Sequence, residues 1–195
     1  MPDFSYDSYC GIYCGACEIM MSCKTGNKYK LASFWNEATV KSLHKGLGIK
    51  YDDSQPFKTE CRGCKSDMQF INCRVCKIRE CALNRKIEHC IDCDKYPCDQ
   101  ISGMKKNEIS LPHIKDNHPN LITIKKFGTD QWLSEQSTKW KCPDCGMDFA
   151  WYSSKCFTCG KDLSKYAHKL SFFHLLLLKI GIYLLSRRKP SKVNL

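Results

Sequence analysis

Sixteen cysteines dominate the chemistry that this 195-residue sequence can support. C-x2-C pairs recur at 14/17, 61/64, 73/76, 90/93, 142/145 and 156/159. A tight turn between the two members of such a pair directs both sulfur atoms towards one tetrahedral ion. The spacing therefore predicts metal sites built from thiolates.

The last four cysteines form the clearest of these sites. They follow the pattern C-x2-C-x10-C-x2-C, and Gly146 and Gly160 come directly after the two pairs. Glycine permits the positive φ angle that lets backbone N–H groups approach the sulfur atoms. The pattern predicts a zinc ribbon around one structural zinc ion, with a single rubredoxin-like iron as the competing interpretation. Phe149, Trp151 and Tyr152 lie between the pairs and favour a short β-hairpin.

The twelve N-terminal cysteines leave their grouping open. In chain order they group as 10/14/17/23, 61/64/73/76 and 81/90/93/98, and interleaved sites are equally compatible. Cys10, Cys14 and Cys17 form C-x3-C-x2-C, the spacing with which radical S-adenosylmethionine enzymes bind an iron–sulfur cluster. The sequence lacks the run of βα units that the barrel of those enzymes needs. We expect zinc here, with an iron–sulfur cluster of redox or enzymatic role at these three cysteines as the alternative.

No other constellation indicates catalysis. The sequence shows no Ser/His/Asp set, no glycine-rich phosphate loop and no paired carboxylates. His89 adjoins Cys90, but a histidine beside a metal site more often supports a ligand than acts as one, so we leave it out of the ligand set. A zinc ion with four thiolates has no open position for water. We therefore predict no catalytic residue and expect a non-enzymatic protein.

The N-terminus and the charge distribution limit where the protein acts. The start, MPDFSYDSYC, lacks the basic and apolar segments of a signal peptide, so we expect a cytoplasmic protein in which structural disulfides are rare. The formal net charge is +11, but residues 161–195 hold eight Lys and Arg against Asp162 alone. Four zinc–tetrathiolate centres would add about −8 to the remainder. This distribution argues against a nucleic-acid-binding body.

The elements that must position the cysteines are mostly helical. Apolar periodicity predicts a helix over 29–45, and good helix formers predict another over 74–87. Pro119 and Gly128 delimit a further helix, and Thr129 is placed to cap the next one. The predicted class is α+β: a small, metal-stabilised, mainly α cysteine-rich domain, a short β zinc ribbon and a C-terminal apolar helix. The predicted divisions are a metal-binding domain at 1–105, a helical connector at 106–139, the ribbon at 140–162 and a basic apolar tail at 163–195.

The tail contains the most apolar stretch, residues 170–185. As a helix this stretch is about 24 Å long, while the hydrocarbon core of a bilayer is about 30 Å thick. One half of its helical wheel is wholly apolar, and both flanks are basic. We expect residues 170–189 to lie on the inner face of a membrane, in the interfacial layer. The alternatives are a spanning helix and a helix packed on the protein's own body or on a protein partner.

Four motifs between residues 10 and 98 resemble one known family. They are C-G-x2-C-x2-C at 10–17, C-x-G-C at 61–64, C-x-I-R-x-C-A at 76–82 and C-x2-C-x2-Y-P-C at 90–98. Together they resemble a cysteine-rich microbial domain of unknown function, the 3795 family, which is usually described as zinc-binding. Some members also carry a stretch like residues 120–128 and a terminal zinc ribbon. The likeness thus covers about residues 10–160 of this chain.

The resemblance implies zinc as the cofactor, several ions per chain, and supplies no activity. Its motifs contain ten cysteines, and Cys23 and Cys73 lie outside them as weaker candidates. Taken with the last four, the expected metal ligands are Cys10, Cys14, Cys17, Cys61, Cys64, Cys76, Cys81, Cys90, Cys93, Cys98, Cys142, Cys145, Cys156 and Cys159. We predict an intracellular zinc-binding protein that serves as an interaction or adaptor module for an unidentified protein partner.

Overall fold

The computed structural model describes residues 3–54 and 56–187 of the chain. Helices account for 52% of it, and the described residues contain no β-strand. Two isolated antiparallel bridges, Lys141–Asp148 and Lys155–Asp162, are the only β pairing among them. The mainly α prediction is confirmed, whereas the α+β class and the β zinc ribbon are wrong. The aromatic stretch that was expected to form a hairpin is instead buried among the helices.

The first three helices surround the first cysteine loop. They are α1 (Glu18–Thr25), α2 (Lys30–Phe34) and α3 (Glu37–Leu47). The predicted helix over 29–45 is thus two helices, because the Asn36 side chain accepts a hydrogen bond from the Thr39 N–H at 3.0 Å and starts α3 anew. The buried Glu18 carboxylate accepts the Leu31 N–H at 2.5 Å and so ties α1 to the start of α2.

Three short helices lie among the middle cysteines. They are α4 (Ile71–Arg74), α5 (Lys77–Arg85) and α6 (Asp99–Met104). The helix predicted over 74–87 is confirmed as α5, which ends where Lys86 adopts a left-handed φ of 53°. Most residues of α5 are polar, and Ala82 is its one buried residue. Helices this short are marginal alone, so their stability must come from the contacts around them.

A helical hairpin follows, formed by α7 (Asn117–Phe127) and α8 (Thr129–Lys139). Gly128, at φ 87°, separates the two helices and occupies the cap position that was predicted for Thr129. Leu121 and Trp132 bring the hairpin into the core, where both are completely buried. The Trp132 ring meets the Tyr13 ring edge-on at 6.0 Å, next to the first cysteine loop.

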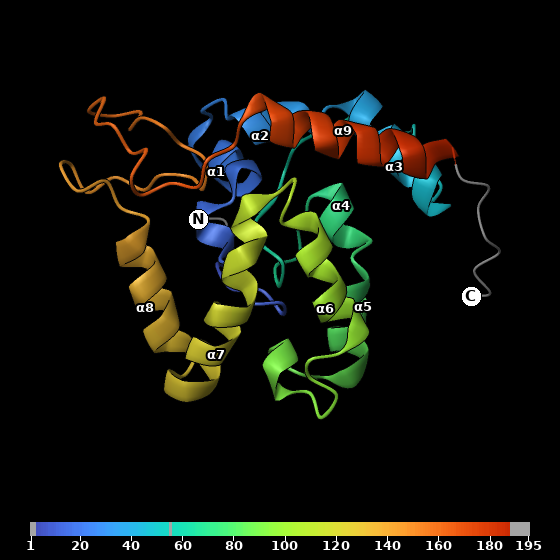
Figure 1. The fold of residues 1–195 in the computed structure, drawn as a ribbon, viewed down its shortest axis with the longest axis horizontal. Helices are drawn as coiled ribbons and strands as arrows, with labels where there is room; N and C mark the ends of the chain where they lie inside the picture. The colour runs from blue at the N-terminus through green and yellow to red at the C-terminus, as the bar shows by residue number, and fades with distance from the viewer. Residues whose placement is uncertain (1–2, 55, 188–195) are drawn as a thin grey trace.

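The last helix, α9 (Phe172–Arg187), lies along α3 at one edge of the molecule, and the hairpin lies below it (Figure 1). Gly46 of α3 makes the close approach possible, because a Cβ there would stand 2.7 Å from Leu185 Cγ. The helix predicted over 170–185 is confirmed. Residues 188 and 189, at the end of the expected membrane-facing segment, lie outside the described residues. Among the described helices, none has both the length and the apolar content to span a bilayer.

One cluster of buried apolar side chains extends from Tyr13 to Ile182. The N-terminal helices, the hairpin, the segment with the last four cysteines and α9 all contribute to it. A small domain gains much of its stability from such a shared core. The division of the chain at 105, 139 and 162 stays a prediction.

Candidate metal centre

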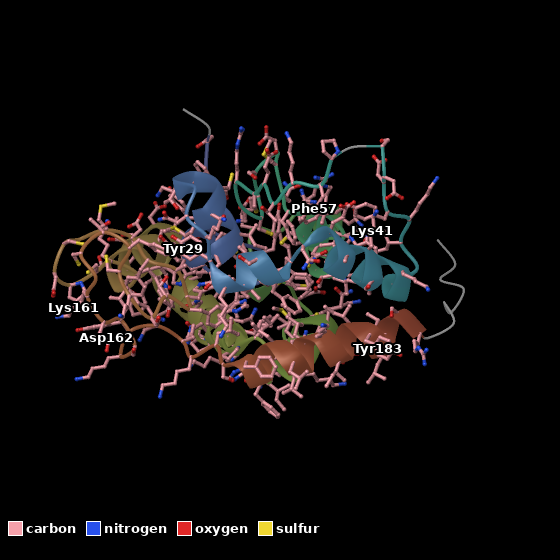
Figure 2. All side chains as sticks on the ribbon, turned by 90° about the horizontal axis from the view of Figure 1, so that it is seen from above. Tyr29, Lys41, Phe57, Lys161, Asp162 and Tyr183 are labelled. Atoms are coloured by element: carbon pink, nitrogen blue, oxygen red, sulfur yellow. The ribbon has the colours of Figure 1, made fainter. Side chains whose placement is uncertain are left out.

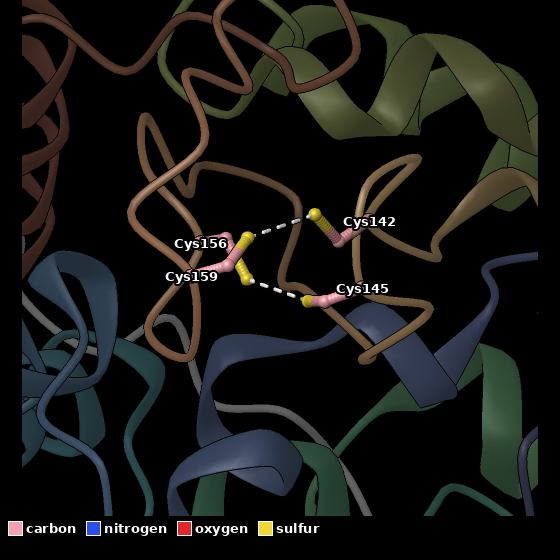
Figure 3. A group of neighbouring side chains, drawn as sticks. All are labelled: Cys142, Cys145, Cys156 and Cys159. Carbon is pink, nitrogen blue, oxygen red and sulfur yellow. Dashed lines mark hydrogen bonds between the residues drawn. The ribbon is translucent and has the colours of Figure 1, made fainter.

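The last four cysteines come together in space, as Figure 3 shows. Their sulfur atoms all lie within 4.8 Å of one another. Cys142 Sγ is 3.6 Å from Cys159 Sγ, and Cys145 Sγ is 3.6 Å from Cys156 Sγ. A disulfide needs about 2.05 Å between sulfur atoms, so these thiols are not bonded to each other. A tetrahedral ion with metal–sulfur bonds of about 2.3 Å sets its ligands about 3.8 Å apart. The group therefore fits a tetrahedral metal ion.

Two matching turns position these sulfur atoms. In the first, the Cys142 N–H donates to the Met147 carbonyl and the Gly146 N–H to the Cys142 carbonyl, both at 2.8 Å. In the second, the Cys156 N–H donates to the Lys161 carbonyl at 2.9 Å, and the Gly160 N–H to the Cys156 carbonyl at 3.0 Å. Both glycines have positive φ, as the sequence predicted.

The electrostatics of the turns favour a thiolate at Cys156, whereas at Cys145 and Cys159 a backbone N–H acts to lower the pKa, but burial and neighbouring thiols raise it. Burial acts to raise the pKa of the Cys156 thiol, but the backbone N–H groups of Cys159 and Thr158 lower it to about 7, with help from neighbouring thiols. Thiolate is the form that binds metal. The carboxylates nearby are already paired, since Asp144 lies 3.0 Å from Lys161 Nζ. Sulfur atoms are thus the ligands that this site offers.

The stretch between the two turns anchors the centre to the rest of the molecule. Phe149, Ala150 and Trp151 are all buried. The Trp151 N–H donates to the Ala16 carbonyl at 2.9 Å, and the Trp151 carbonyl accepts the His168 N–H at 2.7 Å. Its backbone groups are therefore bonded to other parts of the chain, which explains why no hairpin forms within the stretch.

A second set of four thiols lines a small cavity between α5 and α6. Its volume is about 20 Å³, which is room for one water molecule or one ion. The wall also contains Ile78, Ala82 and Ile101. The four thiols are the last group expected from chain order, namely Cys81, Cys90, Cys93 and Cys98. Their sulfur atoms are further apart than those of the C-terminal group, which alone among the described residues satisfies the 4.8 Å distance.

Seven other thiols come from two segments, the first cysteine loop and residues 61–76. Burial, followed by the charges of Cys64 and Cys17, raises the pKa of Cys14 well above its ordinary value. Cys73 as a whole residue is exposed. Its thiol group is nevertheless desolvated, and this burial, followed by the charges of Cys61 and Cys17, raises the thiol pKa in the same way. These thiols thus lie near thiols of the other segment, which is an interleaved arrangement. The seven are Cys10, Cys14, Cys17, Cys61, Cys64, Cys73 and Cys76.

Two weaker predictions about single residues fare differently. Cys23 lies in the last turn of α1 and is exposed. Its charge is not among the causes that shift the pKa values of Cys14 and Cys73. Cys73, by contrast, lies among the thiols of the first two segments. All sixteen cysteines are free thiols in the structure. Whether each N-terminal cysteine binds a metal stays a prediction.

Glycines of the family motifs mark close backbone contacts. Gly63, at φ 118°, packs so tightly that a Cβ there would stand 1.9 Å from the Ser5 carbonyl oxygen. Gly11, at φ 82°, faces α7, where a Cβ would stand 2.7 Å from the Asn117 carbonyl oxygen. Both positions exclude any side chain, so the spacing of the surrounding cysteines depends on glycine there.

An ion cluster that the sequence did not indicate joins three cysteine segments. Lys65 Nζ lies 2.6 Å from Asp7 Oδ2, and His89 Nε2 lies 3.3 Å from the same oxygen. Burial acts to raise the pKa of Asp7, but His89 and then Lys65 hold it well below its ordinary value. His89 therefore faces a carboxylate, and its exclusion from the ligand set stays a prediction. No spacing rule links residues so far apart in sequence, which is why sequence reasoning missed them.

A chain of side-chain amides connects the first cysteine loop with the last cysteine group. Asn120 Nδ2 donates to the Gly11 carbonyl at 2.8 Å, and Asn120 Oδ1 accepts from Gln136 Nε2 at 3.3 Å. Gln136 Oε1 then accepts from Trp140 Nε1 at 3.1 Å. Trp140 stands two residues before Cys142 and accepts the Phe149 N–H at its carbonyl. The hairpin therefore holds both cysteine regions through buried polar contacts.

These features define a helical, cysteine-rich protein with a four-cysteine group that can hold a metal ion. Residues 6–103, half of the chain, match the family model described as a protein of unknown function, DUF3795, and the chain belongs to this family. The match confirms the family that the motifs predicted, and its range ends before the four-cysteine group. Searches of curated proteins and of solved structures gave no match.

Proposed function

We propose that this protein is a zinc-binding protein in which Cys142, Cys145, Cys156 and Cys159 hold one structural zinc ion. The observation that carries the proposal is the near-tetrahedral approach of four free thiols, with two sulfur pairs at 3.6 Å. An iron–sulfur cluster keeps its four cysteines further apart as a group, because their thiolates are divided among two or four irons. Four thiolates also leave no coordination site for a substrate, so this centre is structural and non-enzymatic.

The N-terminal cysteines extend the same proposal to further zinc ions. The cavity lined by Cys81, Cys90, Cys93 and Cys98 supports one such site. The alternative is an iron–sulfur cluster on Cys10, Cys14 and Cys17, whose thiols also feel the charges of Cys76 and Cys61. The role of the protein is then to present a metal-stabilised surface to a partner.

Metal analysis tests the proposal. Full-length protein is purified without oxygen and without added metal, and its zinc, iron and acid-labile sulfide are measured together with its visible spectrum. We expect zinc, no iron and no absorbance near roughly 400 nm. The Cys145→Ser/Cys159→Ser variant changes two exposed ligands and should lose about one zinc per chain. The matched control, Cys23→Ser, changes another exposed cysteine and should lose none.

Three results would overturn the proposal. Iron with sulfide would establish an iron–sulfur protein, and S-adenosylmethionine binding would then be the next test. Iron without sulfide that disappears in the double variant would assign a single-iron centre to the last four cysteines. Equal zinc content in the wild type and the double variant would show that the last four cysteines do not bind it.

A further inference from the structure

The two faces of α9 have different surroundings. Its inner face packs on the body: Ile182 is buried, Leu175 and Leu178 pack against the core, and Leu185 meets Gly46. Its outer face is open to solvent, and Figure 2 shows Tyr183 on that side of the helix. The large apolar side chains exposed there are Phe172, Phe173, Leu176, Ile180, Tyr183 and Leu184.

The more apolar face of α9 points outward, which is the reverse of what is expected for a helix on a surface that faces water. The inner half of the wheel mixes polar residues such as His174 and Ser186 with its apolar ones, while the outer arc is nearly all apolar. Phe172 is 76% exposed and Phe173 is 62% exposed. A surface helix normally buries its most apolar face, and a continuous exposed apolar strip marks an interaction site.

Charge in α9 and in the sequence next to it has a single sign. Residues 163–195 contain seven Lys and Arg and no acidic residue. Lys179 borders the apolar strip, and the Arg187 guanidinium lies 5.0 Å from the centre of the Tyr183 ring. An aromatic side chain beside a long cationic one suits the boundary between acyl chains and headgroups. The surface therefore complements an anionic layer that has an apolar interior.

The geometry of α9 fits a helix that lies flat on such a layer. Sixteen residues make a helix about 24 Å long, which is shorter than the hydrocarbon core of about 30 Å. One long side of the helix is already occupied by α3. Only the outer strip is therefore available, along the whole length of the helix.

We propose that the outer face of α9 docks on an anionic lipid surface, with the exposed strip inserted at the level of the acyl chains and the cations at the headgroups. A second copy of the chain is a poorer occupant. Two such faces would bring Lys179 and Arg187 of both chains together, with no acidic residue on α9 to pair with them. This inference does not depend on the identity of the metal.

Sedimentation with lipid vesicles tests the docking. Full-length, metal-loaded protein is mixed with vesicles of phosphatidylcholine alone or with about three parts in ten of phosphatidylserine, at low and at high salt. We expect binding to the anionic vesicles, weakened by salt, and at least about tenfold weaker binding to the neutral ones.

Two matched variants locate the contact. Phe172→Gln/Phe173→Gln/Ile180→Gln removes the apolar strip and should weaken binding about tenfold or more. Ile109→Gln/Ile122→Gln/Phe127→Gln changes three equally exposed apolar residues elsewhere and should leave binding unchanged. Lys179→Gln/Arg187→Gln should weaken binding to anionic vesicles and reduce its dependence on salt. All eight changed positions are exposed, so the fold should persist, which circular dichroism checks.

Several outcomes would overturn the proposal. Binding that is absent, equal for both vesicle types, or equally reduced by the two apolar variants would each do so. A protein that shows no vesicle binding but a dimer mass by light scattering, which the strip variant turns into a monomer, would assign the face to a second copy instead.

Discussion

The two cysteine regions of this protein achieve proximity of thiols in different ways. The last four cysteines sit on two short turns that fix their own geometry through local hydrogen bonds, and two of the four residues are exposed. The N-terminal cysteines lie on loops and short helices that other parts of the chain hold in place, through Asn120, Asp7 and close contacts at Gly11 and Gly63. The comparison teaches that sequence spacing alone brings thiols together where each turn fixes its own geometry. Where the cysteine motifs are far apart in the sequence, the rest of the fold must bring them together.

Removal of all metal should give the largest effect and test whether the two regions are separable. A structural zinc contributes on the order of 10 kcal/mol to folding at neutral pH. We expect a chelator to abolish most of the helical circular dichroism of the wild type, because the short helices α4, α5 and α6 lack a core of their own. The Cys145→Ser/Cys159→Ser variant should keep most of this signal before chelation. Its complete loss in the variant would show that the two regions do not fold separately.

Alanine substitutions at glycines should sharpen the comparison. Gly63→Ala places a Cβ 1.9 Å from the Ser5 carbonyl oxygen and should lower the free energy of unfolding by about 3 kcal/mol or more. Gly160→Ala meets no atom within 4 Å and bears only the strain of its φ of 76°, so about 1–2 kcal/mol is expected. Denaturant unfolding measures both. Gly103→Ala, in open space within α6, is the control and should be neutral or slightly stabilising. Equal losses at Gly63 and Gly160 would contradict the difference between the regions.

Acid should weaken the contact between the C-terminal segment and the helical body. Burial, and then the charge of His168, lowers the pKa of His113 to about 3 from the ordinary value of 6.5. Because the pKa of His113 is lower in the folded state, the contribution of this buried, neutral side chain to folding stability is complete above pH 6.5. That contribution is lost as the pH falls from 6.5 towards 3. Between about pH 7.5 and about pH 5.5 the loss should be roughly 1 kcal/mol. His113→Gln should remove that part of the slope, as urea unfolding at both pH values would show; identical slopes would contradict the assignment.

The smallest effect is expected at the surface ion pair between the regions. Lys24 of α1 lies 3.2 Å from Asp148, next to the last cysteine group, and both side chains are about a third or more exposed. Exposed pairs of this kind contribute about 0–1 kcal/mol. Lys24→Gln should therefore change the midpoint of thermal unfolding little, and high salt should erase the change. A large loss would mean that the pair, rather than the buried stretch around Trp151, holds the centre in place.

Local signals in the sequence predicted local structure well. The helix end at Gly128, the helix over the C-terminal apolar stretch and the turns at Gly146 and Gly160 all follow from rules that act within a few residues. The break at Asn36 was missed because apolar periodicity continues across it, although asparagine is a strong cap signal.

Predictions that depended on tertiary context failed or stayed open. The stretch around Trp151 has the composition of a hairpin, but its side chains fill a core that other helices provide. The interleaving of the first two cysteine segments could not be derived, because nothing in the spacing says which loops meet. The ion cluster at Asp7 was missed for the same reason. The family match covers the N-terminal region, whereas the geometric case for a metal rests on the C-terminal group.

The amide chain through the hairpin also limits how the length of the protein can vary. One residue inserted into α8 before Gln136 would rotate that side chain by about 100° and shift it by about 1.5 Å. Gln136 would then leave Asn120, while Trp140, four residues further along, would rotate with it and lose its place beside Cys142. The hairpin thus fixes the distance and orientation between the two cysteine regions. We therefore expect no insertions or deletions within the hairpin. The part of the chain between α3 and Cys61 contains no cysteine and none of the close contacts described above, so variation in chain length should accumulate there.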